Sequence, residues 1–210
     1  MKSRSVLIVL LITFILLAGC FYIERNLAKR EMERQINRCA ELQEQNKALT
    51  QSQKTWMIYG YITGYTNANG SKFGEEIPEF AQKIVSYSDE FGVNPDDIMI
   101  ICQHESGFDL YARGGLDERG PGQVLPDTWI DYYQKLGYQL TDFFDWRCNL
   151  RVTVAYFADL VKDNKGDTGA AAGCYNGGPK WESKESARKY SDRFVRASRG
   201  GLKLEKKETK

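Results

Sequence analysis

The sequence has a single histidine, His104, and no Cys-x-x-Cys pair among its five cysteines. Structural and catalytic zinc sites are built mostly from clustered Cys and His ligands, so this scarcity argues against a metal site. The sequence also lacks an excess of charge of one sign, with a formal net charge of +1 over 210 residues. Nucleic-acid-binding domains concentrate positive charge, so nucleic acid is not an expected partner. Nothing in the sequence indicates a cofactor.

The overall composition is that of an ordinary globular protein, with 42% hydrophobic and 27% charged residues. The aromatic content of 12% includes 12 Tyr and 4 Trp. Such side chains either fill a core or serve as platforms for sugar rings, and composition alone does not choose between the two.

The N-terminus reads as an export signal, with a basic start at Lys2 and Arg4 followed by an apolar run. The segment Leu17–Cys20 (LAGC) resembles the bacterial lipoprotein signal, in which small residues precede a cysteine that becomes lipidated after cleavage. The alternative is an uncleaved anchor, because the nearly unbroken apolar stretch 6–23 is just long enough to span a bilayer. Both readings predict an exported, membrane-anchored protein that faces the periplasm or cell wall.

The number of cysteines is consistent with export. If residues 1–20 are a lipoprotein signal ending in a lipidated Cys20, four cysteines remain: Cys39, Cys102, Cys148 and Cys174. An even number in an oxidising compartment allows disulfides, with three possible complete pairings. Buried free thiols are the alternative.

Residues 21–55 are rich in Glu, Gln, Arg and Lys and contain no Gly or Pro. Met32, Ile36, Cys39 and Leu42 form a thin apolar stripe at helical spacing, but the heptads are not sustained as in a long coiled coil. We therefore expect a solvated helical stalk. The alternative is a helix that binds a partner, such as a component of an envelope-spanning machine.

The composition then changes to Tyr, Gly, Asn and Ser, which predicts a linker over residues 56–76. A globular domain is expected over 77–200, followed by a disordered tail at 201–210. Helical periodicity and capping residues predict an all-α fold with at most a small hairpin or long loop in the 109–126 region. The expected helices are 78–92, 94–107, 126–137, 149–163, 167–179 and 183–200.

One helix runs from an apolar stretch directly into a glutamate. Ile98, Ile101, Cys102 and Glu105 lie at i, i+3, i+4 and i+7, so Glu105 shares the buried stripe. Gly107 ends the helix, which places Glu105 at the negative end of the helix dipole. Burial and dipole both disfavour the carboxylate, so its pKa is expected to be raised, as a general acid requires. A core glutamate tied to an Arg, or one exposed by fraying, is the alternative. His104 points away from the stripe and is expected to be a surface or supporting residue.

The sequence contains Glu105-Ser106, then RGPGQ at 119–123, then Tyr175-Asn176 before Gly178-Pro179. In this order and spacing, the three motifs resemble the soluble-lytic-transglycosylase-like domain, which is related to goose-type lysozyme. Glu105-Ser106 resembles the catalytic Glu-Ser pair at the end of the central helix. The segment 119–123 (RGPGQ) resembles the Gly-Leu-Met-Gln segment, and Tyr175-Asn176 followed by Gly178-Pro179 resembles Ala-Tyr-Asn-Ala-Gly-Pro. A later RKY with Tyr190 is similar to the closing Arg-Asn-Tyr helix of the family. The resemblance covers residues 78–198.

Two departures from the family pattern stand out. Pro121-Gly122 replaces Leu-Met, which removes one backbone N–H and one apolar wall, although Gln123 is retained. Cys174 replaces the Ala that precedes Tyr-Asn.

The resemblance implies peptidoglycan as substrate and Glu105 as the catalytic residue. Glu105 would protonate the bridging oxygen between N-acetylmuramic acid and N-acetylglucosamine. It would then act as base toward the muramoyl 6-hydroxyl, which closes onto C1 and leaves a 1,6-anhydro end without using water. The resemblance assigns substrate binding to Ser106, Gln123, Tyr175 and Asn176. Gln123 and Asn176 would bond N-acetyl groups or backbone, Tyr175 would line the site, and Ser106 would orient Glu105 or hold a substrate oxygen.

Two other functions fit the same sequence. The first is an inverting muramidase, in which Glu118 or Asp117 would activate water. The alternative for these two residues is a solvated position on the loop beside Arg119, which would give them no catalytic role. A scaffold that binds glycan without cutting it is the second possibility, but a binder has no need for an acid on its core stripe. The basic residues of the last helix (Arg188, Lys189, Arg193, Arg196 and Arg199) are expected to form a solvated face.

Overall fold

The structure, a computed structural model, describes residues 2–69 and 74–200. The side chains of residues 2–12, 15, 16, 18 and 20 lie outside this description, as do the lipidation candidate Cys20 and the predicted tail at 201–210. The chain divides into two compact units, Met1–Gln51 and Ser52–Lys210. Each unit is described by itself.

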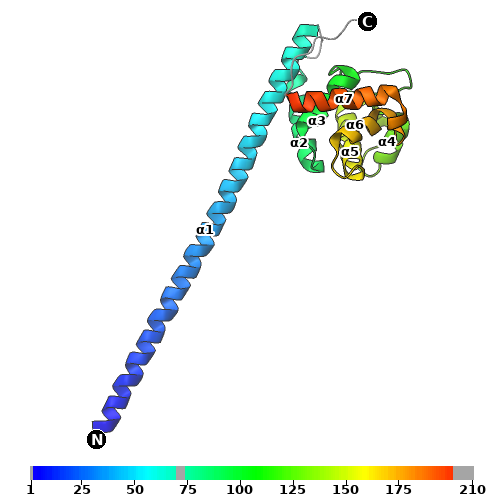
Figure 1. Ribbon diagram of the computed structural model, residues 1–210. Coiled ribbons are helices and arrows are strands. Elements are labelled where there is room, and N and C mark those ends of the chain that lie inside the picture. Colours follow the sequence, from blue (N-terminus) through cyan, green and yellow to red (C-terminus); the bar gives the residue numbers. More distant parts are fainter. Residues whose placement is uncertain (1, 70–73, 201–210) are drawn as a thin grey trace. The chain divides into compact units, whose positions relative to one another are not determined.

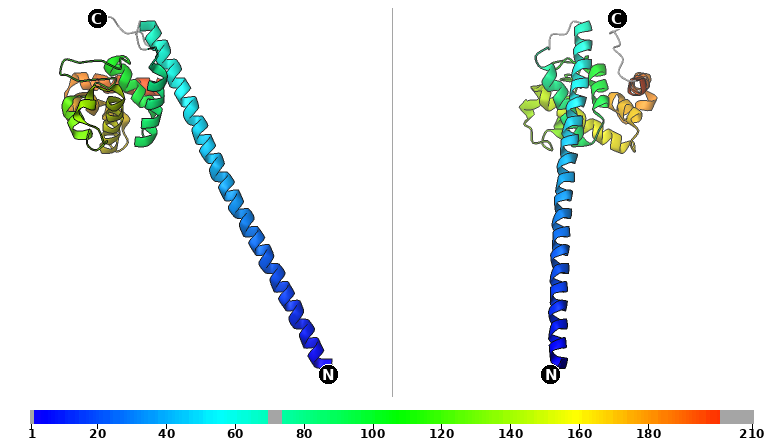
Figure 2. Two further views of the ribbon diagram at one scale, coloured as in Figure 1. Left: turned by 180° about the vertical axis from the view of Figure 1, so that it is seen from behind. Right: turned by 90° about the vertical axis from the view of Figure 1, so that its left-hand side faces the viewer.

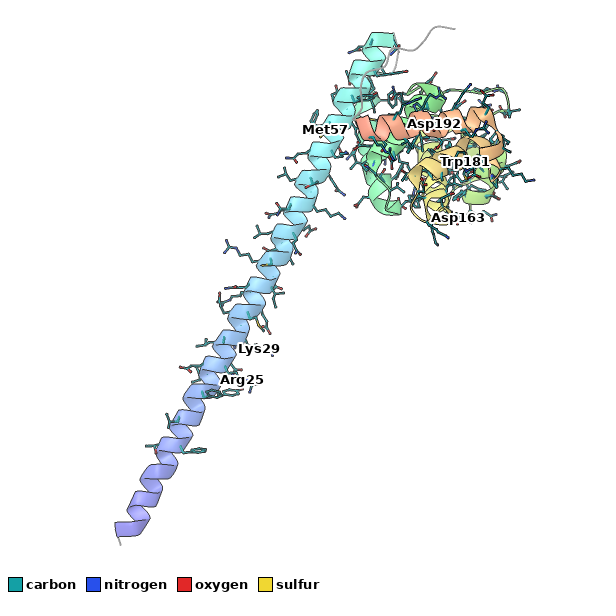
Figure 3. All side chains as sticks on the ribbon, in the orientation of Figure 1. Arg25, Lys29, Met57, Asp163, Trp181 and Asp192 are labelled. Atoms are coloured by element: carbon teal, nitrogen blue, oxygen red, sulfur yellow. The ribbon has the colours of Figure 1, made fainter. Side chains whose placement is uncertain are left out.

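The first unit consists of a single helix, the N-terminal part of α1 (Lys2–Asn69) (Figure 1). Nearly all of its described side chains are exposed, including those of Met32, Ile36 and Leu42. Figure 3 shows side chains such as Arg25 and Lys29 standing out from this helix. Residues 21–51 of the expected stalk are therefore helical and mostly exposed, whereas residues 52–55 belong to the second unit. Among the residues that the structure describes, no helix combines the length and hydropathy needed to cross a membrane.

The second unit is all-helical, as predicted. It contains the end of α1 and the helices α2 (Ile77–Phe91), α3 (Pro95–Ser106), α4 (Pro126–Tyr132), α5 (Trp146–Asp163), α6 (Thr168–Gly177) and α7 (Glu185–Gly200). Two short 3-10 helices, η1 (Leu140–Phe144) and η2 (Trp181–Ser183), complete it. Figure 2 shows this group of helices from behind and from the side.

The predicted linker over 56–76 is wrong for most of its length, because α1 continues through Asn69. Ile58, Ile62 and Tyr65 lie at i, i+4 and i+7 and are 1%, 0% and 5% exposed, so they belong to the main core. Burying an aliphatic side chain completely is worth about 1.5–3 kcal/mol, which is enough to hold this Tyr- and Gly-rich stretch in a helix. The globular unit therefore starts well before Ile77.

The central helix α3 is held at both ends by the residues that the sequence indicated. The Asn94 side chain accepts a hydrogen bond from the Asp96 N–H at 3.1 Å, and Pro95 occupies the first turn. Gly107 closes the helix with a φ of 64°. Residues 98–102 are all buried, so α3 is packed on every side and not along one stripe only. The helix thus runs through the core and delivers its last turn to the surface of the unit.

Helix α5 packs against α2, α4, α6 and η1. Two arginines of α5 pair with carboxylates of α2: Arg147 with Glu79 at 2.6 Å and Arg151 with Glu90 at 2.5 Å. Asp145 and Asp167 cap α5 and α6 by accepting backbone N–H groups at 2.7 and 2.9 Å. The expected helix over 126–137 ends at Tyr132, because only Trp129 of α4 is buried and turns follow up to Gly137.

The four cysteines considered for pairing are free thiols in the described part of the chain. Cys102 and Cys174 are buried, whereas Cys39 is exposed. This arrangement agrees with the buried-thiol alternative for Cys102 and Cys174. Burial raises the pKa of the Cys102 thiol far above its ordinary value, so that thiol stays protonated.

Candidate active site

The segment between α3 and α4 is the long loop that the sequence indicated, and it is tightly cross-bonded. Two isolated antiparallel bridges, Arg113 with Arg119 and Arg119 with Val124, give it a hairpin-like form. Arg119 and Val124 exchange both backbone hydrogen bonds, at 3.0 and 2.9 Å. No β-strand is assigned within the described residues. The prediction of at most a small hairpin in this region is confirmed.

The loop rests on α5 through glycine. A Cβ placed on Gly122 would come within 2.8 Å of three side-chain atoms of Thr153, which is fully buried on α5. Gly120, with a φ of 72°, packs on Asn149 less closely, since an added Cβ would lie 2.9 Å from the nearest Asn149 atom. The glycine at position 122, where the family pattern has Met, therefore has a structural reason, since Thr153 fills the space that a side chain there would need.

Glu105 lies in the last turn of α3, where the buried helix reaches the loop. The pKa of its carboxyl is raised to about 7, mainly by burial and in smaller part by the nearby Glu118 carboxylate. The Tyr190 hydroxyl and Arg193 of α7 act in the opposite direction. A carboxyl with this pKa exists in both protonation states near neutral pH, as a group that must first donate and then accept a proton requires.

Two tyrosines face Glu105 from neighbouring helices. Tyr175 of α6 and Tyr190 of α7 both have pKa values raised well above the ordinary range, first by burial and then by the Glu105 charge. The Tyr190 hydroxyl lies close to the Glu105 carboxyl but is buried without a partner that meets hydrogen-bond geometry. Both side chains are therefore neutral hydroxyls at neutral pH.

His104 supports this arrangement from the adjacent position. Its ring meets the ring of Tyr190 edge-on at 5.4 Å. The pKa of His104 is lowered to about 4, mainly by burial and in smaller part by the positive charge of Arg193. The imidazole is therefore neutral at pH 7. A supporting residue was the expectation for His104, and this geometry agrees with it.

Three of the residues expected to bind substrate are engaged in holding the loop. The Ser106 hydroxyl lies 2.9 Å from the Pro121 carbonyl and 3.1 Å from that of Cys102, and its single hydrogen serves these two acceptors. The Gln123 side-chain amide donates to the carbonyls of Gly120 at 2.9 Å and Ala112 at 3.2 Å. The Tyr175 hydroxyl donates to the Gly122 carbonyl at 2.7 Å. These bonds tie α3, α6 and the loop together around Glu105.

Asn176 differs from the other three. It is exposed in the last turn of α6, and its side-chain amide makes no hydrogen bond within the described part of the chain. Of the four residues predicted to bind substrate, it is the one whose amide is presented to solvent.

The acidic pair of the loop splits into two different environments. Asp117 is exposed and pairs with Arg113 at 2.9 Å and with Arg119 at 2.8 Å. Glu118 is half-buried, accepts the Leu116 N–H at 2.7 Å, and contributes to the raised pKa of Glu105. Glu118 is therefore the one carboxylate of the pair whose charge reaches the acid.

A cavity of about 200 Å³ lies beside the loop, lined among others by Tyr111, Arg119, Phe144 and Asn149. The Arg119 guanidinium lies 5.2 Å from the centre of the Phe144 ring. Glu105, Tyr175 and Tyr190 are not among the lining residues, so the cavity belongs to the packing of the loop on η1 and α5 and not to the surroundings of the acid. Among the described residues, no three His, Cys, Asp or Glu side chains cluster as metal ligands.

Sequence reasoning missed the contributions of Tyr190, Arg193 and Thr153. Tyr190 carried a signal, since it belongs to the closing Arg-Lys-Tyr motif, and Arg193 follows it by three residues on the same helix face. Thr153 carried none, because its importance comes only from its contact with Gly122.

Comparison with known proteins agrees with this geometry. A sequence model of the transglycosylase SLT domain matches residues 82–195, more than half of the chain. The chain belongs to this family.

Two solved structures share the fold. An inactive mutant of the lytic transglycosylase Slt from Pseudomonas aeruginosa superposes with a TM-score of 0.53 at 17% identity, over 72% of this chain and 30% of that one. The 70 kDa soluble lytic transglycosylase SLT70 from Escherichia coli gives a TM-score of 0.52 at 14% identity, over 73% of this chain and 31% of that one. The chain thus corresponds to less than a third of the length of either.

Proposed function

We propose that this protein is a lytic transglycosylase that cleaves the β-1,4 bond between N-acetylmuramic acid and N-acetylglucosamine in peptidoglycan. The observation that carries the proposal is the position of Glu105, a carboxyl with a pKa of about 7 at the end of the buried helix α3. Membership of the transglycosylase SLT domain family supports the substrate class.

In the proposed reaction Glu105 starts protonated and donates its proton to the bridging oxygen. The bond between that oxygen and C1 of the muramoyl residue breaks, and the N-acetylglucosamine end leaves as an alcohol. Glu105, now a carboxylate, takes the proton of the muramoyl 6-hydroxyl, whose oxygen bonds to C1. The products are a 1,6-anhydromuramoyl end and a regenerated acid. One carboxyl suffices because the sugar supplies the nucleophile, unlike hydrolases that use two carboxylates.

The environment of Glu105 suits this cycle. Tyr175 and Tyr190 are neutral hydroxyls near the carboxyl, so neither adds a charge beside the reacting atoms. Asn176 supplies an amide that is free to bond an N-acetyl group of the glycan. The bonds of Ser106, Gln123 and Tyr175 fix the loop, so these three side chains support the site through the loop backbone.

An inverting muramidase is the second candidate, and the position of Glu118 favours it. Such an enzyme would use a second carboxylate to activate water on the opposite face of the sugar. Asp117 is unsuited because two arginines hold it at the exposed end of the loop. Glu118 is closer to the acid, although its carboxylate already accepts the Leu116 N–H. A non-catalytic glycan-binding scaffold is the third candidate, and it leaves the raised pKa of Glu105 without a use.

Mass spectrometry of digested sacculi distinguishes the three functions when Glu118→Gln is compared with the wild type. The transglycosylase predicts 1,6-anhydro products from both proteins and at most a few-fold change in rate for the variant, because the oxygen of the substituted amide can still accept the Leu116 N–H.

Reducing ends, one water heavier, from the wild type and a rate reduced at least about 100-fold in Glu118→Gln would establish the muramidase instead. If neither protein releases soluble products, the non-catalytic scaffold is the remaining function.

We further propose that the protein is exported and anchored to the membrane as a lipoprotein through Cys20, and that residues 21–55 form a stalk that is available to envelope machinery. The support is the LAGC sequence at 17–20 and the exposed helical surface of residues 21–51. Replacing Cys20 by Ser should abolish incorporation of radiolabelled palmitate in cells. A Cys39→Ser variant, altered at an exposed thiol outside the LAGC segment, should label as the wild type does. Labelling that persists in Cys20→Ser would refute the lipid anchor and leave the uncleaved apolar segment as the alternative.

A further inference from the structure

The end of α1 lies outside the segment that matches the family, yet it packs against the part of the chain that carries Glu105. The family match starts at residue 82, whereas the buried face of α1 consists of Ile58, Ile62 and Tyr65. All three belong to the same core cluster as residues 98–102 of α3. The end of α1 is therefore part of the core of the globular unit, although it precedes the segment that the family model matches.

Two tyrosines of α1 contact the chain on both sides of Glu105. The Tyr61 hydroxyl donates a hydrogen bond to the Gln103 side-chain oxygen at 3.0 Å, two residues before the acid. The Tyr65 ring meets the Phe108 ring edge-on at 5.2 Å, three residues after it. Tyr61 also meets Phe108, at 6.2 Å. The segment 103–108 is thus attached to α1 at its beginning and at its end.

The second attachment point is a strained residue. Phe108 has a φ of 64°, directly after Gly107 with the same value. A bulky residue in the left-handed region is unfavourable and persists only where its surroundings hold it there. Phe108 is 1% exposed, and edge-on contacts from Tyr61, Tyr65 and Phe80 surround its ring. Two of the three rings that hold this conformation come from α1.

We propose that Tyr61 and Tyr65 are positioning residues for Glu105, so that the α1 helix preceding the family domain is a working part of its active site. The inference rests on the proposed function of Glu105 as the acid. Helix α1 fixes the end of α3 and the left-handed turn after it. In this way α1 holds the carboxyl in its largely desolvated position near Tyr175 and Tyr190.

A purely structural role for α1 would have a different consequence. Loss of packing alone lowers the stability of the whole unit but leaves the surroundings of Glu105 unchanged in the molecules that remain folded. Loss of positioning admits water to the carboxyl, and its pKa then falls toward its ordinary value. The charged and titratable groups that influence Glu105 are Glu118, Arg193, Tyr190, Tyr175 and Cys102, and none of them lies on α1.

The experiment compares Tyr65→Leu and the milder Tyr61→Phe with the wild type in the full chain. The titration of Glu105 is followed by NMR of carboxyl-labelled glutamate, with the resonance assigned from Glu105→Gln. Rates of sacculus cleavage are measured from pH 5 to pH 9. Ile58→Val, on the same buried face of α1, is the matched control for lost packing.

The expected result is a fall of about 0.5–1 in the pKa of Glu105 in Tyr65→Leu, and a smaller fall in Tyr61→Phe. The alkaline limb of the activity profile should move down by the same amount. The turnover rate should drop about tenfold with little change in KM, since misplacement of the acid affects the chemical step. Ile58→Val should change neither the pKa nor the alkaline limb.

An unchanged Glu105 titration in both tyrosine variants would overturn the proposal. If Tyr65→Leu does not fold, Tyr61→Phe alone decides, because it removes one hydroxyl and keeps the ring. If the wild type cleaves no glycan, the proposed function fails. The NMR titration then still shows whether α1 sets the environment of Glu105, so the two failures are distinguishable.

Discussion

Replacing Glu105 by Gln is expected to abolish glycan cleavage and also to increase the free energy of unfolding. The rate should fall by at least about 1,000-fold, because a general acid and base contributes about 100- to 10,000-fold and Glu105 serves in both steps. Gln keeps the size and polarity of the side chain, so the helix end and the loop should remain as they are.

The stability change has a defined pH dependence. Burial raises the pKa of Glu105 from 4.5 to about 7, so between these values the folded protein holds a proton that the unfolded chain has released. The wild type therefore loses stability as the pH rises through this window, and the full cost is present above pH 7. The cost is about 1–3 kcal/mol. The variant has no such cost, so its advantage should be largest near pH 8 and small near pH 4.5.

Urea denaturation at pH 5 and pH 8, together with the cleavage assay, checks both parts. Glu182→Gln, at an exposed position of η2, is the matched control and should change neither activity nor the pH dependence of stability. Cleavage at the wild-type rate by Glu105→Gln would exclude it as the acid. An identical pH dependence in wild type and variant would contradict the raised pKa.

The second large effect is expected at Gly122. Its Cβ position is occupied by Thr153, so Gly122→Ala should push the loop away from α5 and destabilise the unit by about 2 kcal/mol. Because the Gly122 carbonyl accepts the Tyr175 hydroxyl, the same displacement should loosen the surroundings of Glu105 and lower the cleavage rate. The matched control is Gly115→Ala in the same loop, where an added Cβ meets nothing within 4 Å.

A double-mutant cycle tests the cause. Thr153→Gly alone should cost about 1 kcal/mol or more, since glycine is unfavourable inside a helix and a packed side chain is lost. In that background Gly122→Ala has room, so it should cost much less than in the wild type. The coupling energy should be about 1 kcal/mol or more in the direction of rescue. Strictly additive effects would show that Thr153 is not the obstacle.

Apolar periodicity predicted α2, α3, α5, α6 and α7, and a cap or an early proline marked the starts of α2, α3 and α6. The start of α5 was expected at 149 but lies at Trp146. The same reasoning failed for the segment from 56 onward, where Tyr, Gly, Asn and Ser suggested a linker. The missed signal was the i, i+4, i+7 spacing of Ile58, Ile62 and Tyr65. A short apolar stripe stabilises a helix only when the rest of the fold buries it. The local sequence pattern does not show whether the fold does so.

At the site, the sequence indicated Glu105 and the raised pKa of its carboxyl, because both follow from its place in one helix. The bonds of Ser106, Gln123 and Tyr175 to the loop did not follow, since residue types do not reveal which of several acceptors a side chain reaches. The contact of Gly122 with Thr153 joins positions that are remote in sequence. Only the packed structure brings that pair together.

The same contact has an evolutionary consequence. The loop and α5 share one small volume, which Thr153 fills here and which a Met at position 122 would fill in the family's Gly-Leu-Met-Gln pattern. A protein with only one of the two substitutions would have this volume either overpacked or empty. The two substitutions are therefore expected to arise as a pair. Relatives with a large residue at the position of Gly122 should carry glycine or alanine at that of Thr153, and the departure at Pro121-Gly122 is then one half of an exchange rather than a weakened motif.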